Sequence, residues 1–144
     1  MSYTTDQIKA VTFVRNAIHS PKDVRHFMDI GQPGYTVTAT IDGREIARSS
    51  RVLKVKEVGR GVYDPVLYFM RDDVDMSCLE TTDKTTHCPL KGDTTYFNFN
   101  LNLDGSSHND VAWSYTDTIA DAEVIKDLVA FDNSIVQIVE HTTG

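Results

Sequence analysis

The chain has 144 residues, of which 40% are hydrophobic and 24% are charged, and its formal net charge is -7. This length favours a single domain with its own core, and the composition excludes a disordered chain. The negative charge argues against nucleic acid as a partner, because an acidic surface repels a phosphate backbone.

Two cysteines, Cys78 and Cys88, are too few for a secreted disulfide scaffold. They could pair, but we expect free thiols in a reducing cytoplasm. No apolar run reaches the roughly 20 residues that a membrane span needs, and no signal-peptide pattern opens the chain. We therefore expect a cytoplasmic protein without a membrane partner.

Residues 1–34 are predicted to form a helical extension that packs on the rest of the chain. Thr4 and Gln7 have the spacing of a capping box, and apolar residues then cover a wide arc of a helical wheel up to Ile18. A second subunit could cover part of that arc, which makes a homodimer one hypothesis. A second short helix is predicted from the capping residue Ser20 to the stop at Gly31.

Residues 35–140 are predicted to form a β-rich domain, because the apolar period changes to two at Tyr35. Asp42–Gly43 is typical of a two-residue type I′ hairpin turn. A tight turn or short helical segment is expected over Arg71–Met76. Strands of the first half are predicted over Tyr35–Ile41, Arg44–Ala47, Arg51–Val58 and Val66–Met70.

The clearest strand pattern covers Thr94–Leu103, where apolar residues alternate with asparagines. Asp104–Gly105 predicts a second hairpin turn, followed by a strand that places Val111, Trp113 and Tyr115 on one face. Thr118 is predicted to cap a helix over residues 120–130, before a last strand over Ile135–Val139. The fold class is therefore mainly β (α+β), with antiparallel sheets, N-terminal helices and one C-terminal helix.

One loop, Thr82–Tyr96, gathers more chemically active side chains than any other stretch. Its glycine would let a ligand approach the backbone closely, and nearby cations and aromatic rings could bind an anionic or planar group. The simpler interpretation, that the aromatic residues belong to the core, stays open. The candidate ligand-binding residues are Arg51, Tyr63, Thr86, His87, Cys88, Lys91, Gly92, Tyr96, Trp113 and Tyr115.

The pattern Cys-Pro-x-Lys-Gly, followed at this distance by Trp-Ser-Tyr, resembles the domain of unknown function 427 family, which carries a nucleotidyltransferase-like label. The resemblance extends from about Pro21 to Val139 and departs from the family at Thr118 and Asp132. It implies a compact antiparallel fold of the β-tent (Mss4-like) type, whose relatives hold zinc or a small ligand at the sheet junction. It implies no established reaction. The matching segments are Tyr63–Phe69, Arg71–Val74, Thr85–Gly92 and Val111–Tyr115.

Two enzyme hypotheses follow from the residues. Cys88 could be a nucleophile near His87, but neighbours in a strand point to opposite sides, and a small buried residue is the simpler interpretation. Asp73 and Asp75 have the spacing of an Mg²⁺ site for nucleotidyl transfer, but no Gly-Ser turn precedes them, and we favour a solvated turn with a local ion pair.

Structural zinc is not expected, because the chain has no Cys-x-x-Cys pair, and we assign no metal and no cofactor. The leading hypothesis is a domain that binds a small anionic or nucleotide-like molecule between the 86–92 loop and the 113–115 strand. The alternatives are an enzyme or a structural protein that dimerises. The sequence leaves the ligand, any reaction and the oligomeric state open.

Overall fold

The structure is a computed structural model that describes residues 17–100 and 107–142. Short strands dominate it, and the helical turns are all of the 3-10 type. In chain order the elements are β1 (Ile18–His19), β2 (Phe27–Gly31), β3 (Thr36–Ile41), β4 (Arg44–Ser49), β5 (Leu53–Val58), β6 (Val66–Tyr68), η1 (Arg71–Asp73), η2 (Met76–Cys78), β7 (Leu79–Thr81), β8 (His87–Cys88), β9 (Gly92–Asn100), β10 (Ser107–Thr118), η3 (Ala120–Ile125), β11 (Ala130–Phe131) and β12 (Gln137–His141).

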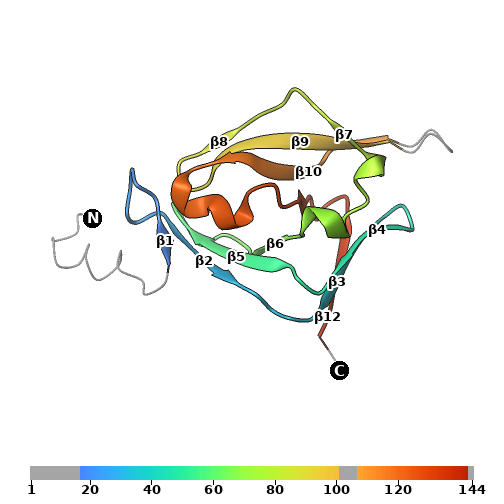
Figure 1. The fold of residues 1–144 in the computed structure, drawn as a ribbon, viewed down its shortest axis with the longest axis horizontal. Helices are drawn as coiled ribbons and strands as arrows, with labels where there is room; N and C mark the ends of the chain where they lie inside the picture. Colours follow the sequence, from blue (N-terminus) through green and yellow to red (C-terminus); the bar gives the residue numbers. More distant parts are fainter. Residues whose placement is uncertain (1–16, 101–106, 143–144) are drawn as a thin grey trace.

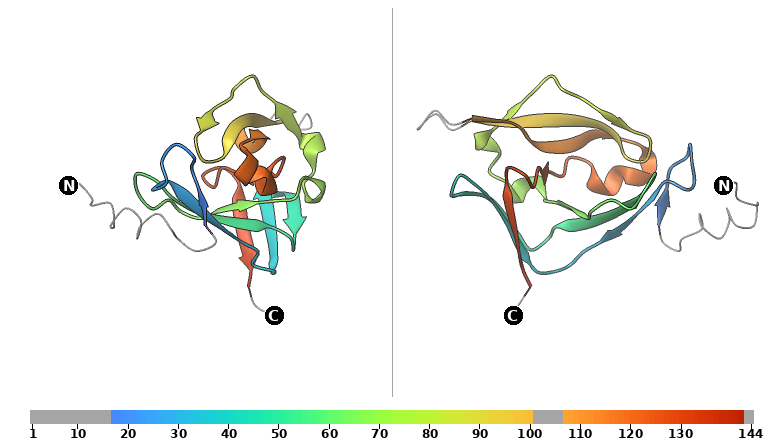
Figure 2. Two further views of the ribbon diagram at one scale, coloured as in Figure 1. Left: turned by 60° about the vertical axis from the view of Figure 1, so that its left-hand side comes forward. Right: turned by 180° about the vertical axis from the view of Figure 1, so that it is seen from behind.

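The strands form three antiparallel sheets. The first has the order β1-β2-β5-β6, the second has the order β11-β10-β9-β7 with β8 also on β9, and the third has the order β12-β3-β4. The long β9–β10 ribbon forms one layer, and the first and third sheets together form the other layer (Figure 1). The views in Figure 2 show the same two layers from the side and from behind, with η3 between them.

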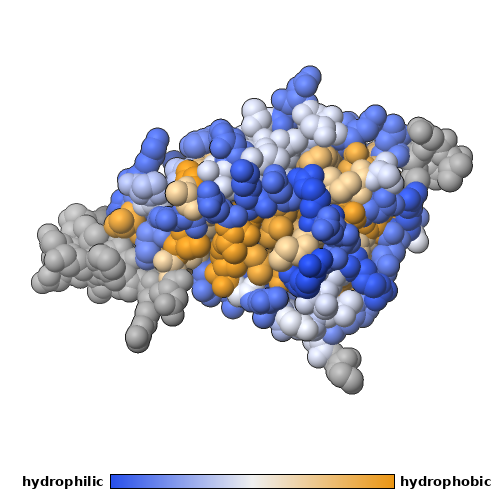
Figure 3. All heavy atoms as spheres, in the orientation of Figure 1, coloured by the Kyte–Doolittle hydropathy of each residue, from blue (hydrophilic) through white to orange (hydrophobic). Residues whose placement is uncertain are grey.

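The core fills the space between these layers in two clusters. One lies between the third sheet and the β9–β10 ribbon and contains Phe69, Phe97 and Phe99. The other lies between the first sheet, β10 and η3, and contains Met28 and Tyr68. On the face shown in Figure 3, apolar side chains gather in a band between polar surroundings, where the two layers meet. Burying the inner faces of both layers is the main source of stability for a domain of this kind.

A short seam joins the first and second sheets. The backbone amide of Phe69 donates to Val129 at 2.8 Å, and the amide of Val129 donates back to Phe69 at 2.9 Å. This reciprocal pair is an antiparallel bridge between the chain after β6 and the chain before β11. The two layers are therefore tied by backbone hydrogen bonds as well as by side-chain packing.

Each predicted strand overlaps a strand of the described residues, although the last one begins at Gln137 and not at Ile135, and β6 ends before Met70. The predicted type I′ turn is consistent with the positive φ angles of Asp42 (49°) and Gly43 (80°), which such a turn requires at both central positions. The alternation over Thr94–Asn100 is also confirmed, because Phe97 and Phe99 are buried while Asn98 and Asn100 are not. The expected helical segment after Val66–Met70 is present as η1 and η2.

The predicted second helix from Ser20 to Gly31 is wrong. Phe27–Gly31 is strand β2, which pairs with β5 along its whole length. Met28 is buried and its neighbour Asp29 is exposed, which is the alternation of a strand. The apolar spacing of this short segment fits both structures, and the pairing with β5 decides between them. The first predicted helix and the Asp104–Gly105 turn lie mainly outside the described residues, although Ile18, expected in that helix, is in β1.

The predicted C-terminal helix over residues 120–130 is replaced by the 3-10 helix η3, which ends at Ile125. Ala122 and Ile125, three residues apart, are both buried, as the 3-10 period allows. The amide of Asp127 then donates to Tyr115 at 3.0 Å, which draws the chain back onto β10 and towards β11. Among residues 17–100 and 107–142, no helix is long and apolar enough to cross a membrane.

Candidate functional site

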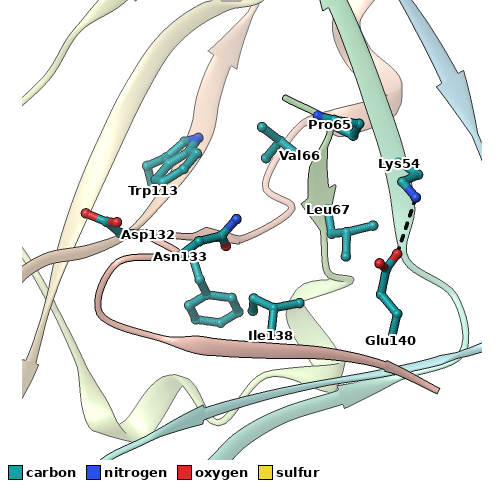
Figure 4. A pocket seen from close by; sticks show the side chains of 10 residues that line it. Lys54, Pro65, Val66, Leu67, Trp113, Asp132, Asn133, Ile138 and Glu140 are labelled. Atoms are coloured by element: carbon teal, nitrogen blue, oxygen red, sulfur yellow. Dashed lines mark hydrogen bonds and ion pairs between the residues drawn. The ribbon is translucent and has the colours of Figure 1, made fainter. Parts of the chain in front are cut away.

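A cleft of about 530 Å³ lies beside Trp113. In Figure 4, Trp113 and Asp132 lie on one side of it, and Leu67 and the Lys54–Glu140 ion pair lie on the other. Strands β5, β6, β10, β11 and β12 all contribute, so the cleft lies where the three sheets meet. The lining residues are Lys54, Pro65, Val66, Leu67, Trp113, Phe131, Asp132, Asn133, Ile138 and Glu140.

The charged groups of the cleft are one cation and two carboxylates. The Lys54 ammonium lies 3.3 Å from a carboxylate oxygen of Glu140. The hydroxyl of Tyr35 donates to the same carboxylate at 2.5 Å, and these bonds lower the pKa of Glu140. Hydrogen bonding to Glu140 also raises the pKa of Lys54, so the pair is ionised at neutral pH. With Asp132 added, the lining carries more negative than positive charge.

A second group of functional side chains surrounds Lys91, whose side chain is only 9% exposed. Its ammonium donates to one carboxylate oxygen of Glu57. The other oxygen of Glu57 lies 2.7 Å from Nε2 of His26. The ammonium also lies 5.3 Å from the ring centre of Tyr115. We call His26, Glu57, Cys88 and Lys91 the buried polar cluster.

The charges in this cluster stabilise one another. Burial opposes the ammonium of Lys91, but the carboxylate of Glu57 beside it acts against burial and raises the pKa of Lys91 above its ordinary value. Burial likewise opposes the carboxylate of Glu57, but Lys91 and His26 outweigh it and lower the pKa of Glu57. Burial also raises the pKa of Tyr115 and of Tyr68, which keeps both phenols neutral. At neutral pH the cluster holds an ammonium and a carboxylate with little access to water.

Backbone contacts hold the members of the cluster in place. The amide of His26 donates to Asp23 at 2.9 Å, and its carbonyl accepts from Ser20 at 2.8 Å. The carbonyl of Glu57 accepts from Tyr63 at 3.1 Å, and the amide of Lys91 donates to Cys88 at 3.2 Å. Each side chain therefore starts from a backbone that is already bonded.

Gly92 is required directly after Lys91. Its φ is +123°, a conformation that residues with side chains rarely adopt. A Cβ at this position would lie 2.2 Å from the carbonyl oxygen of Asp117 and 2.7 Å from Cα of Thr118. The glycine therefore lets β9 approach the end of β10, where the amide of Ile119 donates to the carbonyl of Lys91 at 3.1 Å.

The structure brings part of the predicted ligand site together. Cys88, Lys91 and Tyr115 lie in or against the buried polar cluster. Tyr63 is half exposed, and both it and His26 would contact a Cβ placed on Gly59. Trp113 faces the cleft and also packs in the same apolar cluster as Tyr115.

Other predicted residues lie elsewhere or have other partners. His87, expected near Lys91, is on the exposed side of β8, where its Nδ1 lies 2.7 Å from Asp93. Thr86 bonds the hydroxyls of Thr94 at 2.7 Å and of Tyr96 at 3.0 Å. The guanidinium of Arg51 pairs with Asp73 at 2.9 Å. The predicted site grouped the Lys91 ammonium, the His87 imidazole and the Trp113 indole, and the structure divides it. Trp113 lines the cleft, whereas Lys91 lies in the buried polar cluster, where the imidazole is that of His26.

Two residues of the cluster, His26 and Glu57, were absent from the predicted site. His26 lies in the segment that was predicted to be the second helix, and its place directly before β2 depends on the pairing of that strand with β5. Glu57 could have been selected by a general rule. A lysine that is buried in a loop needs a carboxylate partner, and strand β5 supplies one among valines.

The two candidate Mg²⁺ ligands have separate partners. Asp73 accepts from Arg51 and, at 2.6 Å, from Ser49; these hydrogen bonds lower its pKa, with that from Arg51 the larger cause. Asp75 caps η2 through Ser77, the main cause of its lowered pKa, and pairs with Arg44 at 2.9 Å. Binding of Mg²⁺ between them would have to break both ion pairs.

The geometry defines a mainly β domain whose sheets meet around a cleft and a buried polar cluster. A family model described as a domain of unknown function (DUF427) matches residues 29–142, and the chain belongs to this family. The resemblance of its Cys-Pro-x-Lys-Gly and Trp-Ser-Tyr segments is therefore confirmed. The nucleotidyltransferase label of the family is a name and assigns no activity to this chain. A comparison with curated proteins gave no match.

Proposed function

We propose that this domain binds a small molecule in the cleft beside Trp113. The observation that carries the proposal is the partly exposed indole on one wall of a space of about 530 Å³. Ligand sites in proteins have volumes of roughly 300–1,000 Å³ and combine apolar walls with a few polar groups. Here Val66, Leu67 and Ile138 supply the apolar surface, and Asp132 and Asn133 supply the polar groups.

The lining favours a planar ligand that is neutral or cationic. Trp113 offers a ring for stacking, and a cation would also be attracted to its face. The carboxylates of Asp132 and Glu140 outnumber the single ammonium of Lys54. We therefore replace the anionic ligand expected from the sequence: a base-like or other aromatic group fits the cleft, whereas a phosphate would be repelled.

Fluorescence provides a direct test, because Trp113 is the single tryptophan of the sequence. Nucleosides, free nucleobases and aromatic amines would be titrated into the protein while the emission of Trp113 is followed. We expect saturable quenching by at least one of these probes. Asn133→Ala should weaken its binding about tenfold or more, which corresponds to the loss of one or two buried hydrogen bonds.

Asn109→Ala is the matched control, because Asn109 is exposed on β10 and does not line the cleft. It should leave the affinity unchanged. A flat response to all probes, or equal weakening by both asparagine variants, would contradict the proposal. Comparing phosphorylated with unphosphorylated nucleosides tests the charge argument separately.

The remaining hypotheses stand as follows. For a Cys88 nucleophile, the imidazole of His26 lies near the thiol, but its Nε2 already faces Glu57. Dimerisation through the first helix concerns residues outside the described ranges and stays a prediction.

The free thiols of Cys78 and Cys88 support the expected cytoplasmic location. The β-tent architecture also stays a prediction from the family resemblance.

A further inference from the structure

Three side chains that can bind a metal ion meet in the buried polar cluster. Nε2 of His26, a carboxylate oxygen of Glu57 and Sγ of Cys88 all lie within 4.8 Å of one another. They come from three segments far apart in the sequence: the residue before β2, the end of β5, and β8. All three are partly buried, with side-chain exposures of 19% for His26 and 15% for Glu57.

We propose that His26, Glu57 and Cys88 form a Zn²⁺ site. Zinc binds imidazole nitrogen, carboxylate oxygen and thiolate sulfur at about 2.0–2.3 Å, so ligand atoms in a tetrahedral site are about 3.3–3.8 Å apart. To reach that geometry, the 2.7 Å between Nε2 of His26 and Glu57 would widen by about 0.6 Å, and the longest separation, which is at most 4.8 Å, would shrink by about 1 Å. A set of three protein ligands leaves the fourth position for water or another small ligand.

The charges of the cluster suit a divalent ion. Binding would turn the thiol of Cys88 into a thiolate and release one proton; because Lys91 already balances the carboxylate of Glu57, a water in the fourth position that loses a proton to become hydroxide would supply the second negative charge. The ion would take the place of the proton between Nε2 of His26 and Glu57, which now lie 2.7 Å apart; that proton would move to Nδ1, so that the imidazole binds as a neutral ring. Lys91 would remain on the other carboxylate oxygen and fix the orientation of Glu57, as residues bonded to metal ligands commonly do.

The softness of the ligand atoms decides which of the common divalent ions fits the site. Mg²⁺ and Ca²⁺ take oxygen ligands, whereas a site with one sulfur and one nitrogen among three ligands favours zinc. The partial exposure of His26 and Glu57 leaves a route for the ion. The hydrogen bonds that hold the backbones of His26 and Glu57 place these ligands before an ion arrives.

The test uses the full-length chain, treated with a chelator and kept reduced. Co²⁺ serves as a spectroscopic probe, and Zn²⁺ then competes with it. We expect one Co²⁺ per chain, a thiolate-to-cobalt absorption band in the near ultraviolet, and displacement by one equivalent of Zn²⁺. Cys88→Ser should abolish the thiolate band and weaken Zn²⁺ binding at least about tenfold, and His26→Gln should weaken binding similarly.

Matched controls are available for both ligand types. Cys78→Ser removes the other thiol, which is buried and donates to the carbonyl of Asp75. His87→Gln removes an exposed imidazole that pairs with Asp93. Neither change should alter the cobalt spectrum or the affinity for zinc. Far-ultraviolet circular dichroism would show that each variant is folded, and Cys88→Ala replaces Cys88→Ser if the serine is not tolerated.

Failure to bind either ion stoichiometrically would overturn the proposal. So would an unchanged thiolate band in the Cys88 variant, or loss of that band in the Cys78 variant instead. The result is independent of the cleft, because neither His26, Glu57 nor Cys88 lines it.

Discussion

Replacing Lys91 by methionine tests how much the buried ion pair contributes to stability. Methionine keeps most of the apolar length that packs near Tyr115 but removes the ammonium. The carboxylate of Glu57, with 15% of its side chain exposed, would then keep its hydrogen bond to the imidazole of His26 but lose the ammonium. Leaving one member of a buried pair without the other costs about 3–5 kcal/mol, and we expect about 3 kcal/mol because His26 remains.

Urea unfolding followed by circular dichroism measures this loss as a shift of the midpoint. Arg48→Met is the matched control, because the Arg48–Glu45 pair is 59% and 45% exposed and such pairs contribute about 1 kcal/mol or less. Adding Glu57→Gln to Lys91→Met should restore part of the lost stability, since the uncompensated charge is removed. A loss for Lys91→Met no larger than that for Arg48→Met would refute the reasoning.

The stability difference between the wild type and Lys91→Met should depend on pH. The folded-state pKa of Glu57 is lowered from the model-compound value of 4.5, so its contribution is complete above that value and is lost as the pH falls through the folded pKa. The stability difference between the wild type and Lys91→Met should therefore shrink below pH 4.5. For Lys91, whose pKa is raised from 10.5, the contribution is complete below that value and is lost only at higher pH. A difference that stays constant from pH 7 to pH 3 would contradict the assignment of charges.

Two further substitutions test the packing. Gly92→Ala should cost more than about 3 kcal/mol or prevent folding, because its Cβ would lie 2.2 Å from the carbonyl oxygen of Asp117. Gly34→Ala, at φ +81° with nothing within 4 Å, should cost only about 1–2 kcal/mol, and equal costs in urea unfolding would contradict the clash. Phe99→Ala should lower the free energy of unfolding by about 3–5 kcal/mol, because Phe99 is fully buried. Val62→Ala should change it by less than about 0.5 kcal/mol, because Val62 is 85% exposed. Similar thermal midpoints for those two variants would refute the placement of the core.

The strands could be predicted because a sheet with one buried face imposes a period of two on the sequence. Phe97 and Phe99 point into the core because both lie on the inner face of β9. The type I′ turn could be predicted because Asp-Gly accepts positive φ at both positions. These signals are local, so they need no knowledge of the rest of the chain.

The elements that were predicted wrongly depend on distant partners. The residues of β2 fit a helix equally well until β5 pairs with them. The chain after Ile125 leaves the helical path because Asp127 bonds Tyr115, more than ten residues earlier. Neither partner can be read from the spacing of the residues concerned.

The site was predictable only in part for the same reason. Lys91 and Trp113 could be selected by residue type and by position beside a glycine or on a patterned strand. Their neighbours Glu57 and His26 depend on how β2, β5 and β8 are arranged in space. A zinc site assembled from three separate segments also escapes a search for Cys-x-x-Cys, which detects only ligands that are close in sequence.

The reciprocal hydrogen bonds between Phe69 and Val129 have a consequence for how the domain opens. Both residues are fully buried, so water reaches their amides only when the two layers part. These two protons should exchange with solvent deuterium among the slowest in the molecule, at a rate set by global unfolding rather than by local fraying. One narrow contact of two residues thereby reports when the two layers separate.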